Sequence, residues 1–270
     1  MSALYPLVRN LYAFSTRFGV SRSPSRIGSS PRSVSSFLIA SCILLFYIPA
    51  LTAQSADTLY ADRANLASAR RAAAIWSAAL AADARDFDAA WKLARADYWL
   101  GGHGPDAERR KDLEQGIEAG RKAAAAQPTR PEGHFWIAAN MGALAESFGV
   151  RQGLKYRKPI KEALETVLRL EPAFLDGSAD RALGRWYFKV PGLFGGDRTR
   201  AETHLRKSLT YNPNSTTSHF FLGELLADEG RKDEARAEFQ RVIDAPLSAN
   251  WAPEDQEFKD KARARLASLR

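Results

Sequence analysis

The sequence is poor in the residues on which many functions depend. Its 270 residues include a single cysteine, Cys42, so no disulfide can form within the chain. None of the four histidines, His103, His134, His204 and His219, has another histidine three or four residues away, and we expect no metal site. No glycine-rich loop ends in Lys-Ser or Lys-Thr, and no Gly-x-Ser-x-Gly motif occurs. We therefore expect a protein without catalytic activity, metal or cofactor.

Acidic residues are missing from the N-terminal segment. Residues 1–56 contain five arginines, no lysine and no acidic residue, and Asp57 is the first carboxylate. Much of the net charge of +8 comes from this segment, because the remainder of the chain has mixed charge without a lysine or arginine run. A basic patch of the kind that binds nucleic acid is therefore not indicated, and we expect no nucleic-acid partner.

The N-terminal segment has the pattern of an export signal. An arginine- and serine-rich start precedes the apolar run 37–51, which is shorter than the about 20 residues of a membrane-spanning helix. Leu51 and Ala53 stand where signal peptidase would recognise them. We expect residues 1–53 to be a signal peptide, with an uncleaved membrane anchor or a mitochondrial presequence as alternatives. The expected location is the periplasm or cell envelope.

From residue 56 onward, apolar residues recur at helical spacing and no alternating strand pattern is found. In the clearest unit, Leu222 and Gly223 lie on one predicted helix, Ala235 and Phe239 lie on the next, and Pro246 closes the unit. This order is typical of the tetratricopeptide repeat. The small residues allow two antiparallel helices to approach closely, and the phenylalanine fills the gap between repeats.

The pattern recurs with distortions. Prolines at positions 128, 172, 213 and 246 end four predicted helix pairs, and their intervals of 44, 41 and 33 residues exceed or approach the repeat length. We expect an all-α, right-handed tetratricopeptide-like helical solenoid of about four helix pairs over residues 54–270. Capping helices over 61–84 and 251–270 should cover its ends. Long turns are expected at 100–110, at 148–158 and between residues 190 and 197.

The third of these turns has a distinctive sequence, "VPGLFGGD". Pro191 should end the preceding helix, and Asp197 should cap the next one. Between them, Gly192, Gly195 and Gly196 permit positive φ in a tight reversal. Leu193 and Phe194 are apolar where a surface turn is usually polar. We expect them to fold back onto the neighbouring repeat, as compact loops do, with a role in covering a ligand or partner site as the alternative.

Three stretches carry a resemblance to known families: "WKLARADYWLG", "DRALGRWYFKVPGLFGGDRTRAETHLRKSL" and "APEDQEFKDKARARL". Together they resemble the T-component family associated with TRAP transporters, whose members are helical periplasmic proteins of bacteria. The "GRWYFKVPGL" stretch is also similar to the eukaryotic regulator of microtubule dynamics family. The resemblance covers roughly residues 58–265. It implies an α-helical scaffold that binds a small organic ligand or a partner solute-binding protein.

The first helix of each pair lines the concave surface of such arrays, and we look for binding residues there. Arg95 and Arg185 stand at equivalent positions and could clamp a carboxylate, or they could be structural. Aromatic residues such as Trp136 and Phe188 are more typical of the core. The candidate set is Arg95, Tyr98, Trp136, Asn140, Arg181, Arg185, Leu193, Phe194 and His219.

We therefore expect an exported, non-catalytic binding or scaffold protein that assists solute uptake from the periplasm. The alternative is a general protein–protein interaction scaffold of the cell envelope. The expected partner is a periplasmic solute-binding protein or another protein, a small organic ligand, or both. The N-terminal segment is the one part expected to contact the membrane, and oligomerisation is compatible with this architecture. An enclosed pocket lined by Arg185 would favour a solute, whereas an open polar groove would favour a peptide.

Overall fold

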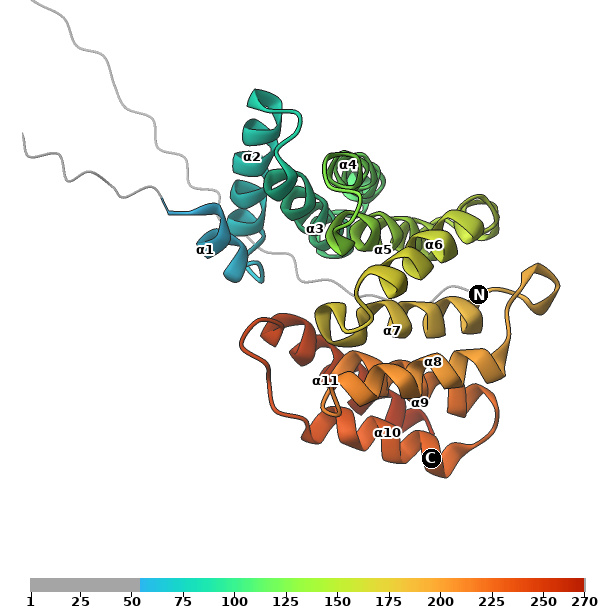
Figure 1. The fold of residues 1–270 in the computed structure, drawn as a ribbon. Helices are drawn as coiled ribbons and strands as arrows, with labels where there is room; N and C mark the ends of the chain where they lie inside the picture. Colours follow the sequence, from blue (N-terminus) through green and yellow to red (C-terminus); the bar gives the residue numbers. More distant parts are fainter. Residues whose placement is uncertain (1–53, 270) are drawn as a thin grey trace, which may run out of the picture. The chain divides into compact units, whose positions relative to one another are not determined.

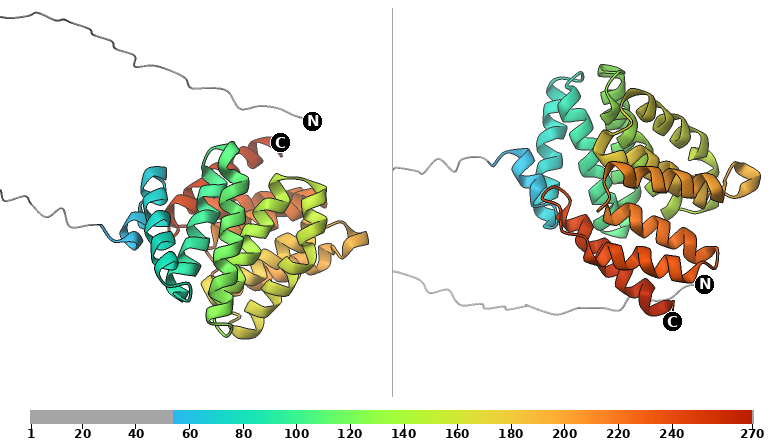
Figure 2. Two further views of the ribbon diagram at one scale, coloured as in Figure 1. Left: turned by 90° about the horizontal axis from the view of Figure 1, so that it is seen from above. Right: turned by 60° about the horizontal axis from the view of Figure 1, so that its bottom comes forward.

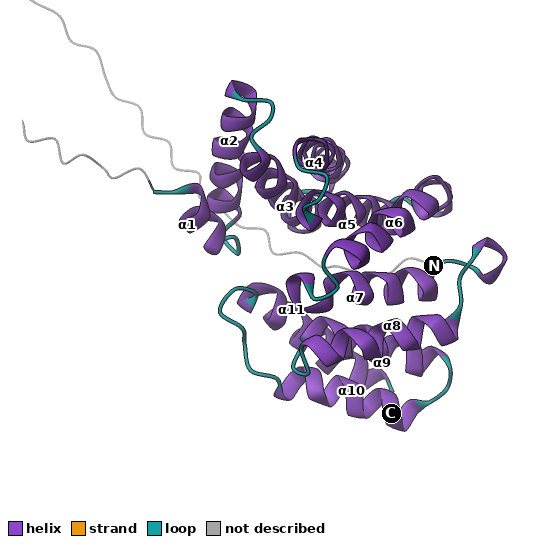
Figure 3. Cartoon of the chain, in the orientation of Figure 1, coloured by secondary structure: helices purple, strands orange, loops and turns teal. Residues whose placement is uncertain are grey.

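The computed structural model describes residues 54–269, which form helices joined by short connections and contain no strand in that range (Figures 1 and 3). The signal or anchor expected at residues 1–53 lies outside the described residues. The helices are α1 (Ala56–Ala61), α2 (Leu66–Ala82), α3 (Phe87–His103), α4 (Asp106–Ala126), α5 (Pro131–Ser147), α6 (Val150–Leu170), α7 (Phe174–Lys189), the 3₁₀ turn η1 (Gly192–Phe194), α8 (Arg198–Tyr211), α9 (Thr216–Asp228), α10 (Lys232–Asp244) and α11 (Ala252–Ser268).

The helices pair as the sequence predicts. Helices α3–α4, α5–α6, α7–α8 and α9–α10 form four consecutive hairpins, with α1 and α2 before them and α11 after them (Figure 2). The all-α, tetratricopeptide-like solenoid is therefore confirmed. In α7 the backbone is left-handed at Leu175, Asp176 and Gly177, so regular helix begins at Ser178.

Small residues sit at the closest approach of paired helices. A Cβ placed on Gly223 would lie 2.8 Å from the ring of Phe239, and one placed on Gly184 would lie 2.5 Å from Leu205. Real Cβ atoms do not approach neighbours so closely, so both positions depend on the absence of a side chain. Phe239 and Leu205 are themselves fully buried. The predicted register of these two hairpins is confirmed.

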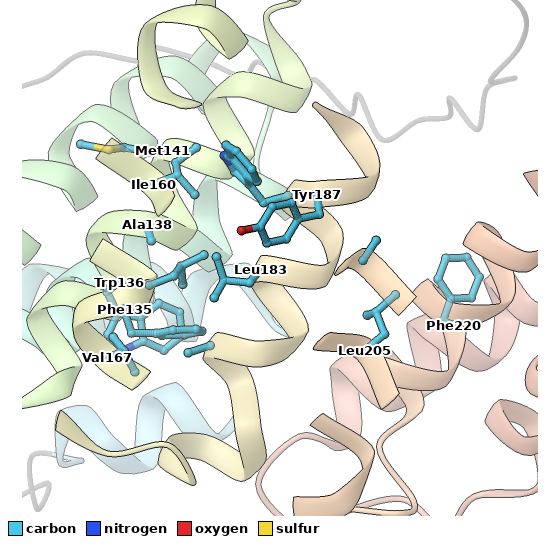
Figure 4. Close-up of a cluster of buried hydrophobic side chains, with 14 of the residues drawn as sticks. Phe135, Trp136, Ala138, Met141, Ile160, Val167, Leu183, Tyr187, Leu205 and Phe220 are labelled. Carbon is cyan, nitrogen blue, oxygen red and sulfur yellow. The ribbon is translucent and has the colours of Figure 1, made fainter. Parts of the chain in front are cut away.

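The larger hydrophobic core runs between the hairpins. Figure 4 shows Phe135 and Trp136 of α5 close to Leu183 of α7, while Leu205 of α8 lies toward Phe220 of α9. A second core, rich in alanine, joins α1–α4. Each helix pair therefore buries its apolar stripe against the next pair, as a stacked array requires.

Contacts also join helices that are far apart in the sequence. Arg63, in the turn between α1 and α2, pairs with Glu254 at the start of α11 and donates to the carbonyl of Asn250 at 2.7 Å. The ring of His103 in α3 lies 3.2 Å from the carboxylate of Glu257 in α11. The beginning and the end of the helical array are thus bound to one another.

Two of the three predicted long turns are wrong. The α3–α4 connection is Gly104 and Pro105, and the α5–α6 connection is Phe148 and Gly149, with the rest of each segment helical. Residues 150–158 are mostly good helix formers. Gly149 has a φ of 80°, so one residue makes the reversal that we expect from a longer turn.

The third long turn is confirmed. Helix α7 ends at Lys189, two residues before Pro191, and the side chain of Asp197 accepts a hydrogen bond from the backbone N–H of Arg200. One of its three glycines, Gly195, adopts positive φ, at 103°. Gly196 is needed for a different reason, because a Cβ there would overlap the carbonyl oxygen of Val190.

Candidate interaction surfaces

We call the surface formed by the first helices of the hairpins and by α11 the A-helix face; it comprises α3, α5, α7, α9 and α11. Most of the predicted binding residues lie on these helices. The structure divides them into residues already engaged by the protein itself and residues that remain available to a partner.

Arg185 is engaged. Its Nε donates to Glu146 of α5 at 3.0 Å, its Nη1 donates to Glu224 of α9, and its guanidinium lies 4.6 Å from the ring centre of Phe221. Glu224 also accepts from Arg265 of α11 at 2.6 Å. Burial lowers the pKa of Arg185, but the two carboxylates outweigh it and raise the pKa overall. Arg185 therefore ties three hairpins together, and a ligand carboxylate would have to displace its present partners.

Arg95 occupies the equivalent register position but a different environment. Its guanidinium lies 4.1 Å from the ring centre of Tyr60 and 4.9 Å from that of Trp91, and 3.9 Å from the carboxylate of Asp57. Burial lowers the pKa of Arg95. Helix α1 thus covers this arginine, and the two arginines do not form one carboxylate clamp.

Three further candidates belong to the core. Trp136 is buried against Phe135. Asn140 is fully buried and donates from Nδ2 to the carbonyl oxygens of Ala94 and Trp136, at 3.0 and 2.8 Å. His219 is buried with Nδ1 2.6 Å from Glu238 and Nε2 2.8 Å from the carbonyl of Pro213. These contacts explain the residues structurally.

Arg181 and Tyr98 remain available on the A-helix face. Arg181 of α7 makes no hydrogen bond or ion pair with another residue between 54 and 269, and burial lowers its pKa. Tyr98 of α3 is 40% exposed, and its ring centre lies 5.7 Å from that of Trp136. Loss of solvation in this partly enclosed place, together with the negative charge of Glu146 and other carboxylates, raises the pKa of Tyr98 to about 12. The guanidinium of Arg181 and the hydroxyl of Tyr98 therefore have no hydrogen-bond partner among the described residues, although the ring of Tyr98 packs against Trp136.

The structure overturns the expectation that Leu193 folds back onto a neighbouring repeat. Leu193 is 89% exposed, and the α7–α8 connection protrudes from the helices in both Figures 1 and 2. The turn closes on itself, because the backbone N–H groups of Phe194 and Gly196 both donate to the carbonyl of Pro191, at 2.8 and 3.2 Å. This closure holds Leu193 at the outside. Phe194, 39% exposed, lies with its ring centre 5.6 Å from the guanidinium of Arg157.

A pocket of about 280 Å³ lies beside this turn. It is lined by Arg157, Lys158, Lys161, Trp186, Leu193, Phe194 and Gly195, and we call it the loop pocket. Its three cations were not among the predicted site residues. The available signal was the run 151–161, which carries five basic residues before the first acidic residue, Glu162. Because residues 148–158 are predicted as a turn, the sequence does not indicate that these three cations share helix α6.

Two other kinds of site are not found within residues 54–269. No group of three histidine, cysteine, aspartate or glutamate side chains in this range is placed to hold a metal ion. None of the helices in the same range combines the length and the apolar character needed to cross a bilayer.

Several solved structures share this fold. TTC0263, a thermophilic TPR protein in Thermus thermophilus, matches with 24% identity over 79% of this chain and 94% of that chain, with a TM-score of 0.58. PilF of Pseudomonas aeruginosa matches with 18% identity over 79% and 91%, with a TM-score of 0.47. YrrB, a TPR protein with an unusual peptide-binding site, matches with 18% identity over 72% and 92%, with a TM-score of 0.42. The tetratricopeptide fold rests on the first of these matches.

At the sequence level, a search of curated proteins found no match. The family model described as regulator of microtubule dynamics protein 1-3 matches residues 52–203, which is more than half of the chain. The matched region runs from before α1 into α8 and includes the α7–α8 connection with its loop pocket. The chain therefore belongs to the regulator of microtubule dynamics protein 1-3 family.

Proposed function

We propose that this protein is a non-catalytic scaffold that binds a partner protein through the A-helix face, at Arg181 and Tyr98. The observation that carries the proposal is the contrast on α7 between Arg185, held by two carboxylates, and Arg181, which has no such partner among the described residues. Arg181 and Tyr98 influence one another electrostatically, and arginine and tyrosine are among the residue types that most often dominate protein interfaces.

A protein partner fits this surface better than a small carboxylate ligand does. The arginine that a ligand clamp would need, Arg185, already has two carboxylate partners. A peptide could instead use the guanidinium of Arg181 and the exposed part of Tyr98 without breaking an existing ion pair.

Photo-crosslinking in cells tests the proposal. A photoreactive phenylalanine analogue at Tyr98 should form adducts with another protein, and Arg181→Glu should abolish most of them. The matched control places the analogue at Gln240, an exposed position on α10. Equal adducts from both positions, or none from Tyr98, would contradict the proposal. Native mass spectrometry of the purified protein would reveal a bound small molecule if the solute alternative were correct.

The proposed location follows from the N-terminal segment. Its arginine-rich start, apolar run and small residues support export to the periplasm or cell envelope, and the T-component resemblance supports a solute-binding protein as the partner. N-terminal sequencing of the protein from the envelope fraction should begin at Gln54. Retention of residues 1–53 in that fraction would instead indicate an uncleaved anchor.

A further inference from the structure

The loop pocket brings together two opposed kinds of wall. Helix α6 supplies Arg157, Lys158 and Lys161, while the α7–α8 connection supplies Leu193 and Phe194. No carboxylate lines the pocket among the described residues. A second groove, of about 630 Å³ between α2 and α4, is lined by charges of both signs. The loop pocket therefore differs in presenting one sign of charge to an occupant.

The three cations are only weakly used by the protein itself. Lys158 makes no ion pair with another described residue. Lys161 lies 3.6 Å from Glu165 one turn along the same half-buried helix face, and 5.7 Å from the ring centres of Trp186 and Tyr187. An ion pair this long and this accessible to solvent contributes little. Arg157 donates to the carbonyl of Leu154 at 2.8 Å, which leaves its other donors for a ligand. The pocket can therefore bind an anion without breaking a strong contact.

The apolar wall is ordered. Besides the bonds to Pro191, the N–H of Asp197 donates to the carbonyl of Tyr187 at 3.0 Å and anchors the end of the connection to α7. The indole N–H of Trp186 donates to the carbonyl of Arg157 at 2.9 Å, which ties α7 to α6 at the pocket. Leu193 is thus held in an exposed position rather than left there by a loose chain, and a contact with it would cost little ordering entropy.

We propose that the loop pocket binds an extended segment of a partner protein in which acidic and apolar residues alternate. On α6, residues 157 and 161 are separated by about 6 Å along the helix axis. In an extended chain, side chains two residues apart lie on one side, about 6.5–7 Å apart. Two alternate carboxylates therefore match Arg157 and Lys161, while the apolar residues between them face Leu193 and Phe194.

The shape of the site favours a peptide over a membrane surface. A flat, anionic bilayer could contact Leu193 but would not fill a pocket between a helix and a loop. An extended chain can enter such a pocket and contact both walls at once. This proposal rests on the proposed function, since it assumes that the protein binds polypeptides, but it concerns a surface separate from Arg181 and Tyr98.

Fluorescence anisotropy with the full chain tests the proposal. The probe is a fluorescein-labelled peptide of alternating aspartate and leucine, and its control has asparagine in place of aspartate. Arg157→Gln combined with Lys161→Gln, which removes both cations that face the carboxylates, should weaken binding of the aspartate peptide about tenfold. The matched control combines Arg151→Gln with Lys155→Gln, which removes the same charge from the same helix outside the pocket, and should weaken binding by less than about threefold.

Leu193→Ser should also weaken binding, because it removes the apolar contact and leaves every cation in place. Since Leu193 is exposed, this variant keeps the test valid even if the variant at Arg157 and Lys161 proves unstable. Equal losses in the pocket variant and its matched control, or equal binding of the asparagine peptide, would overturn the proposal. So would binding to phosphatidylglycerol vesicles without binding to the peptide. Crosslinking at Tyr98 reports on the proposed function independently, so the two can fail separately.

Discussion

The α7–α8 and α9–α10 hairpins are packed alike but connected differently. In both, a glycine of the first helix lies against a fully buried side chain of the second, Gly184 against Leu205 and Gly223 against Phe239. The α9–α10 connection is three residues long and turns at a glycine with φ of 79°. The α7–α8 connection runs from 190 to 197, protrudes, and carries the most exposed large apolar side chain among the described residues, Leu193.

The comparison separates two uses of the same repeat. Helix packing allows little variation in these two hairpins, because their close approach depends on a glycine that faces a large, fully buried side chain. The residues that connect two helices do not pack in this way, so a longer connection can gain a binding role without disturbing the hairpin. The α7–α8 hairpin keeps the packing of its neighbour and adds the apolar wall of the loop pocket.

The largest effect is expected at the core of the regular hairpin. Phe239→Ala removes a fully buried ring that contacts Gly223 and Phe220, and it should lower the free energy of unfolding by about 3–5 kcal/mol. Urea denaturation followed by circular dichroism measures this loss. A loss below about 1 kcal/mol would mean that the two helices are not paired through this ring.

A somewhat smaller effect is expected when either packing glycine gains a side chain. Gly184→Leu and Gly223→Leu should each destabilise the protein by about 1–3 kcal/mol, because the paired helix must move away. Gly142 of α5 is the control, since a Cβ there meets no atom within 4 Å. Thermal melting should show a lower midpoint for the two packing variants and not for Gly142→Leu.

The α3–α4 hairpin differs from these two hairpins at one buried position, and this difference should make the stability of the protein depend on pH. The packing position of α3, equivalent to Gly184 and Gly223, is the buried Ala94. Three residues after this position, α7 has buried Tyr187 and α9 has buried Leu226, but α3 has buried Asp97. Burial, with Asp112 nearby, raises the pKa of Asp97 to about 8. The folded protein therefore binds a proton that the unfolded chain releases, so stability should fall as pH rises from about 4 to 8.

Asp97→Asn should remove this dependence. At pH 8.5 the variant should be more stable than the unaltered protein by about 1–3 kcal/mol, and at pH 5 the two should be similar. Urea denaturation at both pH values gives the result. Asp260→Asn, at an exposed position of α11, should change stability equally at both pH values. If Asp97→Asn behaved in the same way, the raised pKa would be refuted.

The smallest effect is expected in the protruding connection. Replacing Leu193 and Phe194 together by serine should change the free energy of unfolding by less than about 1 kcal/mol, because neither side chain is buried. The same variant should bind the acidic peptide more weakly. A loss of several kcal/mol would show that the connection belongs to the core after all and would end the contrast with α9–α10.

Much of the architecture was accessible from residue patterns. Gly223, Ala235 and Phe239 predicted the last hairpin, and Pro191 and Asp197 predicted where one helix ends and the next begins. Such features act over a few residues, so the sequence displays them directly. The long turns predicted at 100–110 and 148–158 were wrong because these segments contain both glycines and good helix formers. Most of their residues are helical in the structure.

The candidate binding residues were harder to predict because their roles depend on distant partners. Arg95 and Arg185 look equivalent in the sequence, but α1 covers the first, and Glu146 and Glu224 hold the second. Arg181, four residues from Arg185, was predicted as a binding residue. Nothing in the sequence indicated that it, unlike Arg185, would have no carboxylate partner among the described residues. The loop pocket was not predicted because its two walls, at residues 157–161 and 193–195, are more than thirty residues apart along the chain.

The sequence by itself determined the all-α class, the hairpin register and the cap at Asp197, because spacing of small and large residues and local backbone chemistry fix them. Only the tertiary structure decided which charges are paired, which remain available, and that Leu193 faces solvent beside three cations of α6. The physical reason is that ion pairing and burial depend on which helices become neighbours. Residues 39 positions apart, such as Glu146 and Arg185, meet only after the hairpins have stacked.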